Sequence, residues 1–226
     1  MKQECLKIGQ TPAIIYGEAS AHAWLFVHGM GGNKTEAEPF AALTGAQVLA
    51  IDLPGHGERK DMAGFNPWTA APELRTVMGY MRARWSAVSL RANSIGAYFS
   101  MLALSDQGLQ KALFVSPIVN MERLILDMMG WAGVTEAQLR EAGEIATDFG
   151  QTLSWQYLSW VREHPLNWHT PTAILYAGHD NLTSRDTITS FANAHQASLS
   201  VYEPGEHWFH TPDQLDAMTR WEKSEI

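Results

Sequence analysis

Short apolar runs alternate with helix-compatible segments along most of this chain. The runs at residues 23–28, 47–51, 111–116 and 172–177 are mostly apolar, which is typical of strands buried on both faces of a parallel sheet. Their alternation with helical segments predicts a doubly wound, mostly parallel α/β sheet. Functional groups in such sheets gather just beyond the carboxyl ends of the strands. The residues that end each run are therefore the first candidates for a site.

Length and composition restrict the class of protein. The 226 residues suit a single domain, residues 1–226, with room for a substantial core. Hydrophobic residues make up 46% of the chain and charged residues 18%, as in ordinary soluble globular proteins. The formal net charge of -8 argues against nucleic acid as a partner, because phosphate binding needs a basic surface.

The sequence predicts neither a membrane span nor a signal peptide. No apolar run approaches the ~18 residues that a membrane-spanning helix needs. Residues 1–5 lack the apolar core of a signal peptide. Cys5 is the only cysteine, so no intrachain disulfide can form and a cytoplasmic location is expected.

Residues 88–98 have the layout of a strand, a sharp turn and a helix, with Ser94 at the turn. This layout is typical of a nucleophile elbow, in which a strained turn lifts the serine hydroxyl clear of the sheet. Small residues are needed two positions before and after the serine, where Ala92 and Gly96 stand. The usual pattern has glycine at both positions, so Ala92 departs from it by one methyl group. The competing interpretation is that Ser94 only caps the helix.

A serine nucleophile needs a base within hydrogen-bond reach and a third group that orients the base. His207 is the candidate base, because it follows a predicted strand and a Pro-Gly pair at 204–205. Asp180 is the candidate orienting acid, at the end of the preceding predicted strand. His210 is the rival for the base, whereas Asp186 is expected to be a charge in the first turn of a helix.

Acyl transfer also needs fixed donors for the oxyanion that develops on the substrate. The backbone N–H of Ile95, at the start of the helix after Ser94, is one candidate donor. The backbone N–H of Met30 is the other, because the glycines on both sides of Met30 allow the backbone to approach a substrate.

Five motifs together resemble the α/β-hydrolase superfamily. They are His-Gly-Met-Gly-Gly at 28–32, Asp-Leu-Pro-Gly-His-Gly at 52–57, the elbow at 92–96, Gly-His-Asp at 178–180 and Gly-Glu-His at 205–207. The chain is identified as a small, single-domain member similar to serine esterases, and the resemblance covers nearly its full length. The order serine, aspartate, histidine matches this superfamily and not chymotrypsin or subtilisin.

The resemblance implies an eight-stranded sheet with an insertion after the sixth strand that serves as a cap. Residues 118–168 occupy that place, and their length implies a small helical cap. Three cap helices are predicted near 121–130, 135–147 and 151–163, separated by glycines. Elsewhere, Pro72 fits the first turn of a helix that runs to about residue 85.

The expected cap is rich in methionine and aromatic residues. Most of these are expected to pack the cap onto the core. Because a cap closes a pocket from above, Met128, Trp131 and Trp155 are candidates for substrate contact. Such an adaptable apolar wall favours an apolar acyl or alcohol group over a sugar or a phosphate.

These features together predict a serine hydrolase that cleaves a small carboxylic ester or thioester through an acyl-enzyme intermediate. The same triad also serves amide or peptide cleavage, C–C bond hydrolysis and cofactor-free peroxidase chemistry. A ligand-binding protein on a hydrolase scaffold is a further alternative. The sequence contains no metal-ligand cluster, phosphate-binding loop or dinucleotide fingerprint, so no metal and no cofactor are expected.

Overall fold

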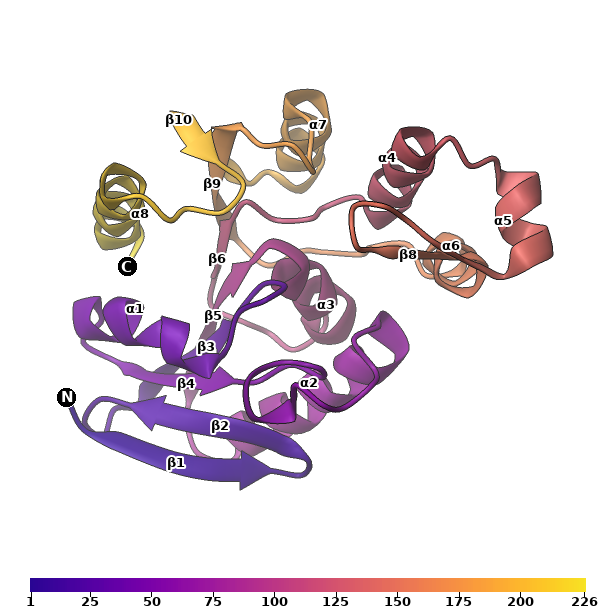
Figure 1. Cartoon of the computed structure of the whole chain (residues 1–226). Coiled ribbons are helices and arrows are strands. Elements are labelled where there is room, and N and C mark those ends of the chain that lie inside the picture. The colour runs from indigo at the N-terminus through magenta and orange to yellow at the C-terminus, as the bar shows by residue number, and fades with distance from the viewer. The chain divides into compact units, whose positions relative to one another are not determined.

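An eight-stranded sheet is the framework of the protein in the computed structural model, which describes residues 1–226 (Figure 1). The strand order is β1-β2-β4-β3-β5-β6-β9-β10. The strands are β1 (Gln3–Ile8), β2 (Thr11–Tyr16), β3 (His22–Val27), β4 (Gln47–Ile51), β5 (Ala87–Asn93), β6 (Ala112–Val115), β9 (Thr172–His179) and β10 (Ser198–Glu206). The β1–β2 and β2–β4 pairs are antiparallel and all others are parallel, which confirms the predicted mostly parallel sheet.

The helices that accompany this sheet lie on both of its faces (Figure 1). Helices α1 and α8 contact each other on one face, and α2 and α3 pack together on the other. The bounds are η1 (Lys34–Ala37), α1 (Glu38–Leu43), η2 (Gly57–Arg59), α2 (Pro67–Arg82), α3 (Ser94–Leu104), α7 (Arg185–His195) and α8 (Pro212–Glu225). Under α1 and α8 the core includes Trp24, Phe40 and Trp221, and the rings of Trp24 and Phe40 meet edge to face at 5.3 Å. Burial of each such side chain stabilises the fold by roughly 1.5–3 kcal/mol.

The start of α2 differs from the sequence-based expectation. The helix begins at Pro67 and ends at Arg82, so Pro72 lies inside it and not in its first turn. Asn66 sets the boundary, because its side-chain oxygen accepts a hydrogen bond from the N–H of Thr69 at 2.9 Å. Pro67, which needs no N–H partner at the first helical position, then fits the start of the helix.

The chain divides into two compact units, of which the first is Met1–Val119 with Asn167–Ile226 and contains the sheet. The second unit, Asn120–Leu166, holds α4 (Met121–Ala132), α5 (Glu136–Ala142), a hairpin of β7 (Glu144–Ala146) and β8 (Thr152–Ser154), and α6 (Trp155–Glu163). The guanidinium of Arg162 on α6 joins the three helices, since it lies 2.6 Å from the carboxylate of Glu122 and 2.7 Å from that of Glu136.

The hairpin corrects the expectation of helices over 135–147 and 151–163. Gly143, with φ +75°, ends α5 after residue 142, and Gly150, with φ +80°, lies between the two short strands. That the chain is a single domain, and that the inserted residues act as a cap, both stay predictions. No helix of the structure has the length and apolar character needed to cross a membrane.

Candidate active site

Ser94 lies between β5 and α3 with a backbone φ of +48°, which is unusual for a residue other than glycine. The carbonyl of Ser94 accepts a hydrogen bond from the N–H of Ile118 at 3.1 Å, which helps to hold this strained turn. A methyl group added to Gly96 would lie 2.2 Å from the carbonyl oxygen of His28. Gly96 is therefore required by the close approach of α3 to the end of β3. Ala92 is fully buried within β5, so the fold accommodates the methyl group that departs from the usual elbow pattern.

His207 contacts Ser94 and Asp180 at the same time. Its Nε2 lies 2.8 Å from Oγ of Ser94, and its Nδ1 lies 2.8 Å from Oδ2 of Asp180. An ionised carboxylate only accepts hydrogen bonds, so Nδ1 carries the ring hydrogen and donates it to Asp180. Nε2 is then the acceptor for the hydroxyl hydrogen of Ser94. The structure thus brings together the three residues that the sequence analysis singled out.

The side chain of Asp180 is fully buried, and its other carboxylate oxygen, Oδ1, also has hydrogen-bond partners. Oδ1 accepts hydrogen bonds from the N–H groups of Leu182 at 2.8 Å and Thr183 at 2.9 Å. These two donors fix the orientation of the carboxylate. The carboxylate is positioned to hold the His207 ring and to stabilise a positive charge on it.

The alternative residues have other partners. His210 donates from Nδ1 to the carbonyl of Trp208 at 2.7 Å. Asp186 lies in the first turn of α7, as expected. None of these contacts reaches Ser94, so His207 and Asp180 remain the candidates for base and orienting acid.

The glycine-rich loop after β3 runs beside Ser94. A methyl group added to Gly29 would lie 3.2 Å from Cβ of Ser94, which places the backbone of this loop against the serine. The N–H of Gly32 donates to the carbonyl of Gly29 at 3.2 Å, and Gly31 supplies the positive φ of +78° within this tight turn. In a trans peptide the carbonyl and the next N–H point in opposite directions. The carbonyl of Gly29 is held by hydrogen bonds from the N–H of Gly32 and from Nδ1 of His28. The N–H of Met30, on the same peptide, therefore points in the opposite direction.

The second candidate donor, the N–H of Ile95, lies in the first turn of α3, where backbone N–H groups have no intrahelical acceptor. The residue before the helix, Asn93, makes no side-chain capping bond. Its side-chain oxygen instead accepts a hydrogen bond from Nη1 of Arg91 at 2.5 Å. The positive end of the helix dipole at this point favours a negative charge next to Ser94.

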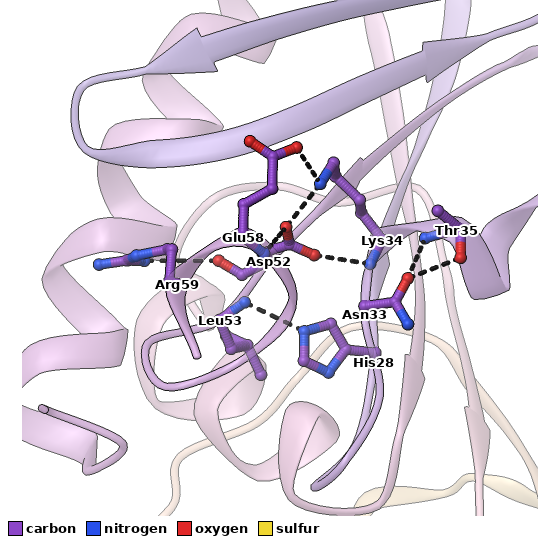
Figure 2. A network of polar contacts seen from close by, with 8 residues as sticks. All are labelled: His28, Asn33, Lys34, Thr35, Asp52, Leu53, Glu58 and Arg59. Carbon is purple, nitrogen blue, oxygen red and sulfur yellow. Dashed lines mark hydrogen bonds and ion pairs between the residues drawn. The ribbon is translucent and has the colours of Figure 1, made fainter. Parts of the chain in front are cut away.

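His28 joins the glycine-rich loop to the loop after β4 (Figure 2). The N–H of Leu53 donates to Nε2 of His28 at 3.0 Å, so Nδ1 carries the ring hydrogen and donates it to the carbonyl of Gly29 at 2.6 Å. Burial lowers the pKa of His28 to about 4, so the ring is neutral at neutral pH. This neutral ring fixes the peptide between Gly29 and Met30.

Asp52 fastens the far end of the same loop (Figure 2). One carboxylate oxygen accepts the N–H of Lys34 at 2.9 Å, and the other accepts Nζ of Lys34 at 2.6 Å and the N–H of Glu58 at 3.0 Å. Burial alone would raise the pKa of Asp52, but these hydrogen bonds lower it below its ordinary value. Nζ of Lys34 also lies 2.7 Å from the carboxylate of Glu58. The candidate oxyanion loop is thus held on both sides by the loop after β4.

The three residues expected to contact substrate all lie in the unit Asn120–Leu166. Met128 is half-buried on α4, and Trp131 is 54% exposed with its ring 6.0 Å from that of Phe149. Trp155, at the start of α6, has the guanidinium of Arg140 over its ring at 5.8 Å. Their contact with substrate stays a prediction.

Two polar residues that support the loops around Ser94 were not predicted from the sequence. Arg91 and Lys34 are both buried. Arg91 lies within the stretch 88–98 but was given no role there, and Lys34 belongs to none of the five motifs. A charged residue inside an apolar strand was the available signal for Arg91, because a buried charge needs a partner. No comparable local signal marked Lys34, whose burial depends on Asp52.

Comparison with known families gives one match, to the alpha/beta hydrolase family over residues 24–222. No curated protein sequence matches the chain.

Solved structures with the same fold include three that align over nearly the whole length of both chains. Est1E from Butyrivibrio proteoclasticus with bound ferulic acid is 15% identical, with a TM-score of 0.72 over 98% of this chain and 97% of that one. The mouse alpha/beta hydrolase domain-containing protein 10 is 13% identical, with a TM-score of 0.74 over 100% and 98%. The thioesterase domain from the curacin biosynthetic pathway is 17% identical, with a TM-score of 0.62 over 98% and 99%. At identities this low, the structural likeness shows the shared fold alone.

Proposed function

Because the chain belongs to the alpha/beta hydrolase family, we propose that it is a serine hydrolase acting on a carboxylic ester or thioester. The observation that carries this proposal is the pair of 2.8 Å contacts that links Ser94, His207 and Asp180. A hydroxyl, an imidazole and a buried carboxylate in this order are the parts that nucleophilic acyl transfer requires.

In the acylation step, Oγ of Ser94 attacks the carbonyl carbon of the substrate while Nε2 of His207 takes the hydroxyl proton. Asp180 stabilises the resulting imidazolium and remains ionised. The tetrahedral intermediate then collapses. The bond from the carbonyl carbon to the leaving oxygen or sulfur breaks, and His207 passes its proton to that atom.

The oxyanion of the intermediate is assigned to the N–H groups of Met30 and Ile95. The glycine-rich loop lies against Ser94, and His28 and Asp52 hold it in place. Donors held in advance lower the activation free energy because they need no reorganisation during the reaction. Removing one such donor typically lowers kcat by about 10²–10³-fold.

In the deacylation step, His207 removes a proton from water, which attacks the acyl carbonyl. The bond to Oγ of Ser94 breaks, Oγ recovers a proton from His207, and the acid is released. The enzyme returns to its starting state without a cofactor.

A small apolar substrate suits this proposal best. Est1E, which shares the fold, is described with bound ferulic acid, and another structure with this fold is a thioesterase domain. The abundance of methionine and aromatic residues in the segment Asn120–Leu166 also supports an apolar group, because such side chains form adaptable apolar surfaces.

The test combines turnover with covalent labelling. The wild-type protein is expected to hydrolyse p-nitrophenyl acetate or butyrate and to gain the mass of one fluorophosphonate probe. Ser94→Ala is expected to lose both, whereas Ser198→Ala, an exposed serine at the opposite end of β10, is expected to keep both. Turnover or labelling that persists in Ser94→Ala, or that is missing from the wild type, contradicts the proposal.

A further inference from the structure

Trp208, the residue directly after His207, has 74% of its surface exposed. Tryptophan is usually well buried in folded proteins, because its large apolar surface is costly to expose to water. An indole this exposed, one residue from the candidate base, offers a large apolar surface to a group bound at that base.

The neighbours of Trp208 hold it outside the core. His207 before it is bound to Ser94 and Asp180, and Phe209 after it is buried in the hydrophobic core. With both adjacent residues anchored, the loop has little freedom to withdraw the indole from the surface.

His210 fixes the orientation of the indole. The two rings are stacked, with centroids 4.6 Å apart and planes 18° apart, and Nδ1 of His210 donates to the carbonyl of Trp208. The backbone N–H of His210 donates to the side chain of buried Gln214 at 3.1 Å. One face of the indole is thus occupied by His210 and the exposed remainder is presented in a defined orientation.

The chemistry of the proposed reaction places the leaving group on this side of the serine. The leaving oxygen must lie within hydrogen-bond distance of Nε2 of His207 to receive its proton. The oxyanion is assigned to other groups, the N–H groups of Met30 and Ile95. The leaving group, and not the carbonyl oxygen, is therefore the part of the substrate nearest to the loop that carries Trp208.

We propose that Trp208 is a specificity-determining residue that stacks on a flat aromatic leaving group, so that aryl esters are favoured substrates. This inference rests on the proposed function, and it names the class of substrate for the same site. In the step that Trp208 assists, the bond from Ser94 Oγ to the carbonyl carbon forms. The bond from that carbon to the aryl oxygen breaks, and the proton moves from His207 to that oxygen.

The first experiment compares phenyl acetate with cyclohexyl acetate, whose leaving groups are similar in size but differ in aromatic character. Trp208→Ala is expected to lower kcat/KM for phenyl acetate by about 3- to 10-fold more than for cyclohexyl acetate. This factor corresponds to the free energy that a pair of contacting aromatic rings usually contributes. Trp208→Phe is expected to keep most of the preference. Leu215→Ala, which removes an exposed apolar side chain from α8, serves as the matched control and is expected to leave the ratio unchanged.

A second measurement separates substrate contact from a structural role. The acetyl-enzyme is the same for both substrates, and its leaving group has already departed. Its rate of hydrolysis in Trp208→Ala is therefore expected to equal that of the wild type. If deacylation slows by the same factor as acylation, Trp208 acts by positioning His207, and the proposal is overturned; an unchanged ratio of the two esters overturns it as well.

A binding measurement keeps this inference separate from the proposed function. In Ser94→Ala, the affinity for phenyl acetate, followed by ligand-observed NMR, is expected to fall about 3- to 10-fold when Trp208→Ala is added. Equal affinities overturn the assignment of Trp208. Missing turnover in the wild type contradicts the proposed hydrolase activity instead, whatever the affinities are.

Discussion

Nε of Arg91 lies 2.8 Å from the carboxylate of Glu222, and only 1% and 3% of these two side chains are exposed. The pair connects β5, the strand that leads into Ser94, with the C-terminal helix α8. Nη1 of the same guanidinium also donates to the carbonyl of Ala92 at 3.1 Å. A contact between residues far apart in sequence thus supports the strand end that presents the candidate nucleophile.

Removing one partner of this buried pair is expected to destabilise the protein strongly. Glu222→Ala leaves the Arg91 guanidinium without its anionic partner, and a loss of about 3–5 kcal/mol in the free energy of unfolding is expected. The double variant Arg91→Met/Glu222→Leu removes both charges and is expected to be more stable than Glu222→Ala. Urea unfolding measures both effects. If the double variant loses as much free energy of unfolding as Arg91→Met and Glu222→Leu lose when their separate losses are added, the pairing itself is unimportant.

Asp180→Asn is expected to lower kcat for p-nitrophenyl acetate by about 10⁴-fold with little effect on folding. Leu182 and Thr183 both donate to Oδ1, so the amide oxygen will occupy that position and the NH2 group will face His207. His207 must then accept at Nδ1 and carry its hydrogen on Nε2, where it cannot take the proton of Ser94. Asp186→Asn, an exposed change in α7, is the control and is expected to keep the wild-type kcat. A kcat of Asp180→Asn near that of the wild type argues against the assigned triad.

Gly96→Ala and Ala92→Gly are expected to have unequal consequences although each changes one methyl group. The methyl group of Gly96→Ala would lie 2.2 Å from the carbonyl oxygen of His28, so the elbow must move, at a cost of about 1–3 kcal/mol or more. Misplacing Ser94 in this way is expected to reduce kcat by at least about 10²-fold. Ala92→Gly only adds backbone freedom to a strand and is expected to cost about 0.5–1 kcal/mol with kcat nearly unchanged. Thermal unfolding and ester turnover measure the two responses, and equal effects of the two variants would contradict the close-approach argument.

The stability of the protein is expected to fall as the pH falls from about 6.5 to about 4 because of His28. Its pKa is about 4 in the folded state against the ordinary value of 6.5, so within this interval the unfolded state binds a proton that the folded state does not. The contribution of His28 is fully present above pH 6.5 and is lost as the pH falls towards 4. It amounts to about 3 kcal/mol over the whole interval.

The measurement is the free energy of unfolding in urea at several pH values, for the wild type and for His28→Gln. The variant lacks the titrating ring, so its stability is expected to depend less steeply on pH between 4 and 6.5. The other histidines are present in both proteins and cancel in the comparison. Identical slopes would mean that His28 is not a neutral, buried group.

The parts of the fold that follow from local pattern could be predicted from the sequence. The alternation of apolar runs with helical segments predicted the parallel sheet, and polar residues after the runs marked one edge of it. The contacts of Ser94 with His207 followed from that reasoning, because strand ends meet at one edge of a parallel sheet. The catalytic roles of these residues stay predictions that the experiments above address.

Other parts depend on contacts between distant positions or on very short elements. The hairpin of β7 and β8 has only three residues in each strand, which is too few to produce a recognisable apolar alternation. The start of α2 was misplaced because both Pro67 and Pro72 fit a first helical turn. The pairing of Arg91 with Glu222 joins residues whose proximity depends on where α8 packs, and no local pattern encodes that position.

The segment Asn120–Leu166 is one uninterrupted stretch of chain inserted between β6 and β9, two strands that pair directly with each other. The sheet is therefore complete without any strand from the segment. Loop-closure entropy grows slowly with length, by only about 0.6 kcal/mol per doubling. This is consequently the place at which the chain can gain or lose residues at small thermodynamic cost, while every strand of the sheet keeps its neighbours.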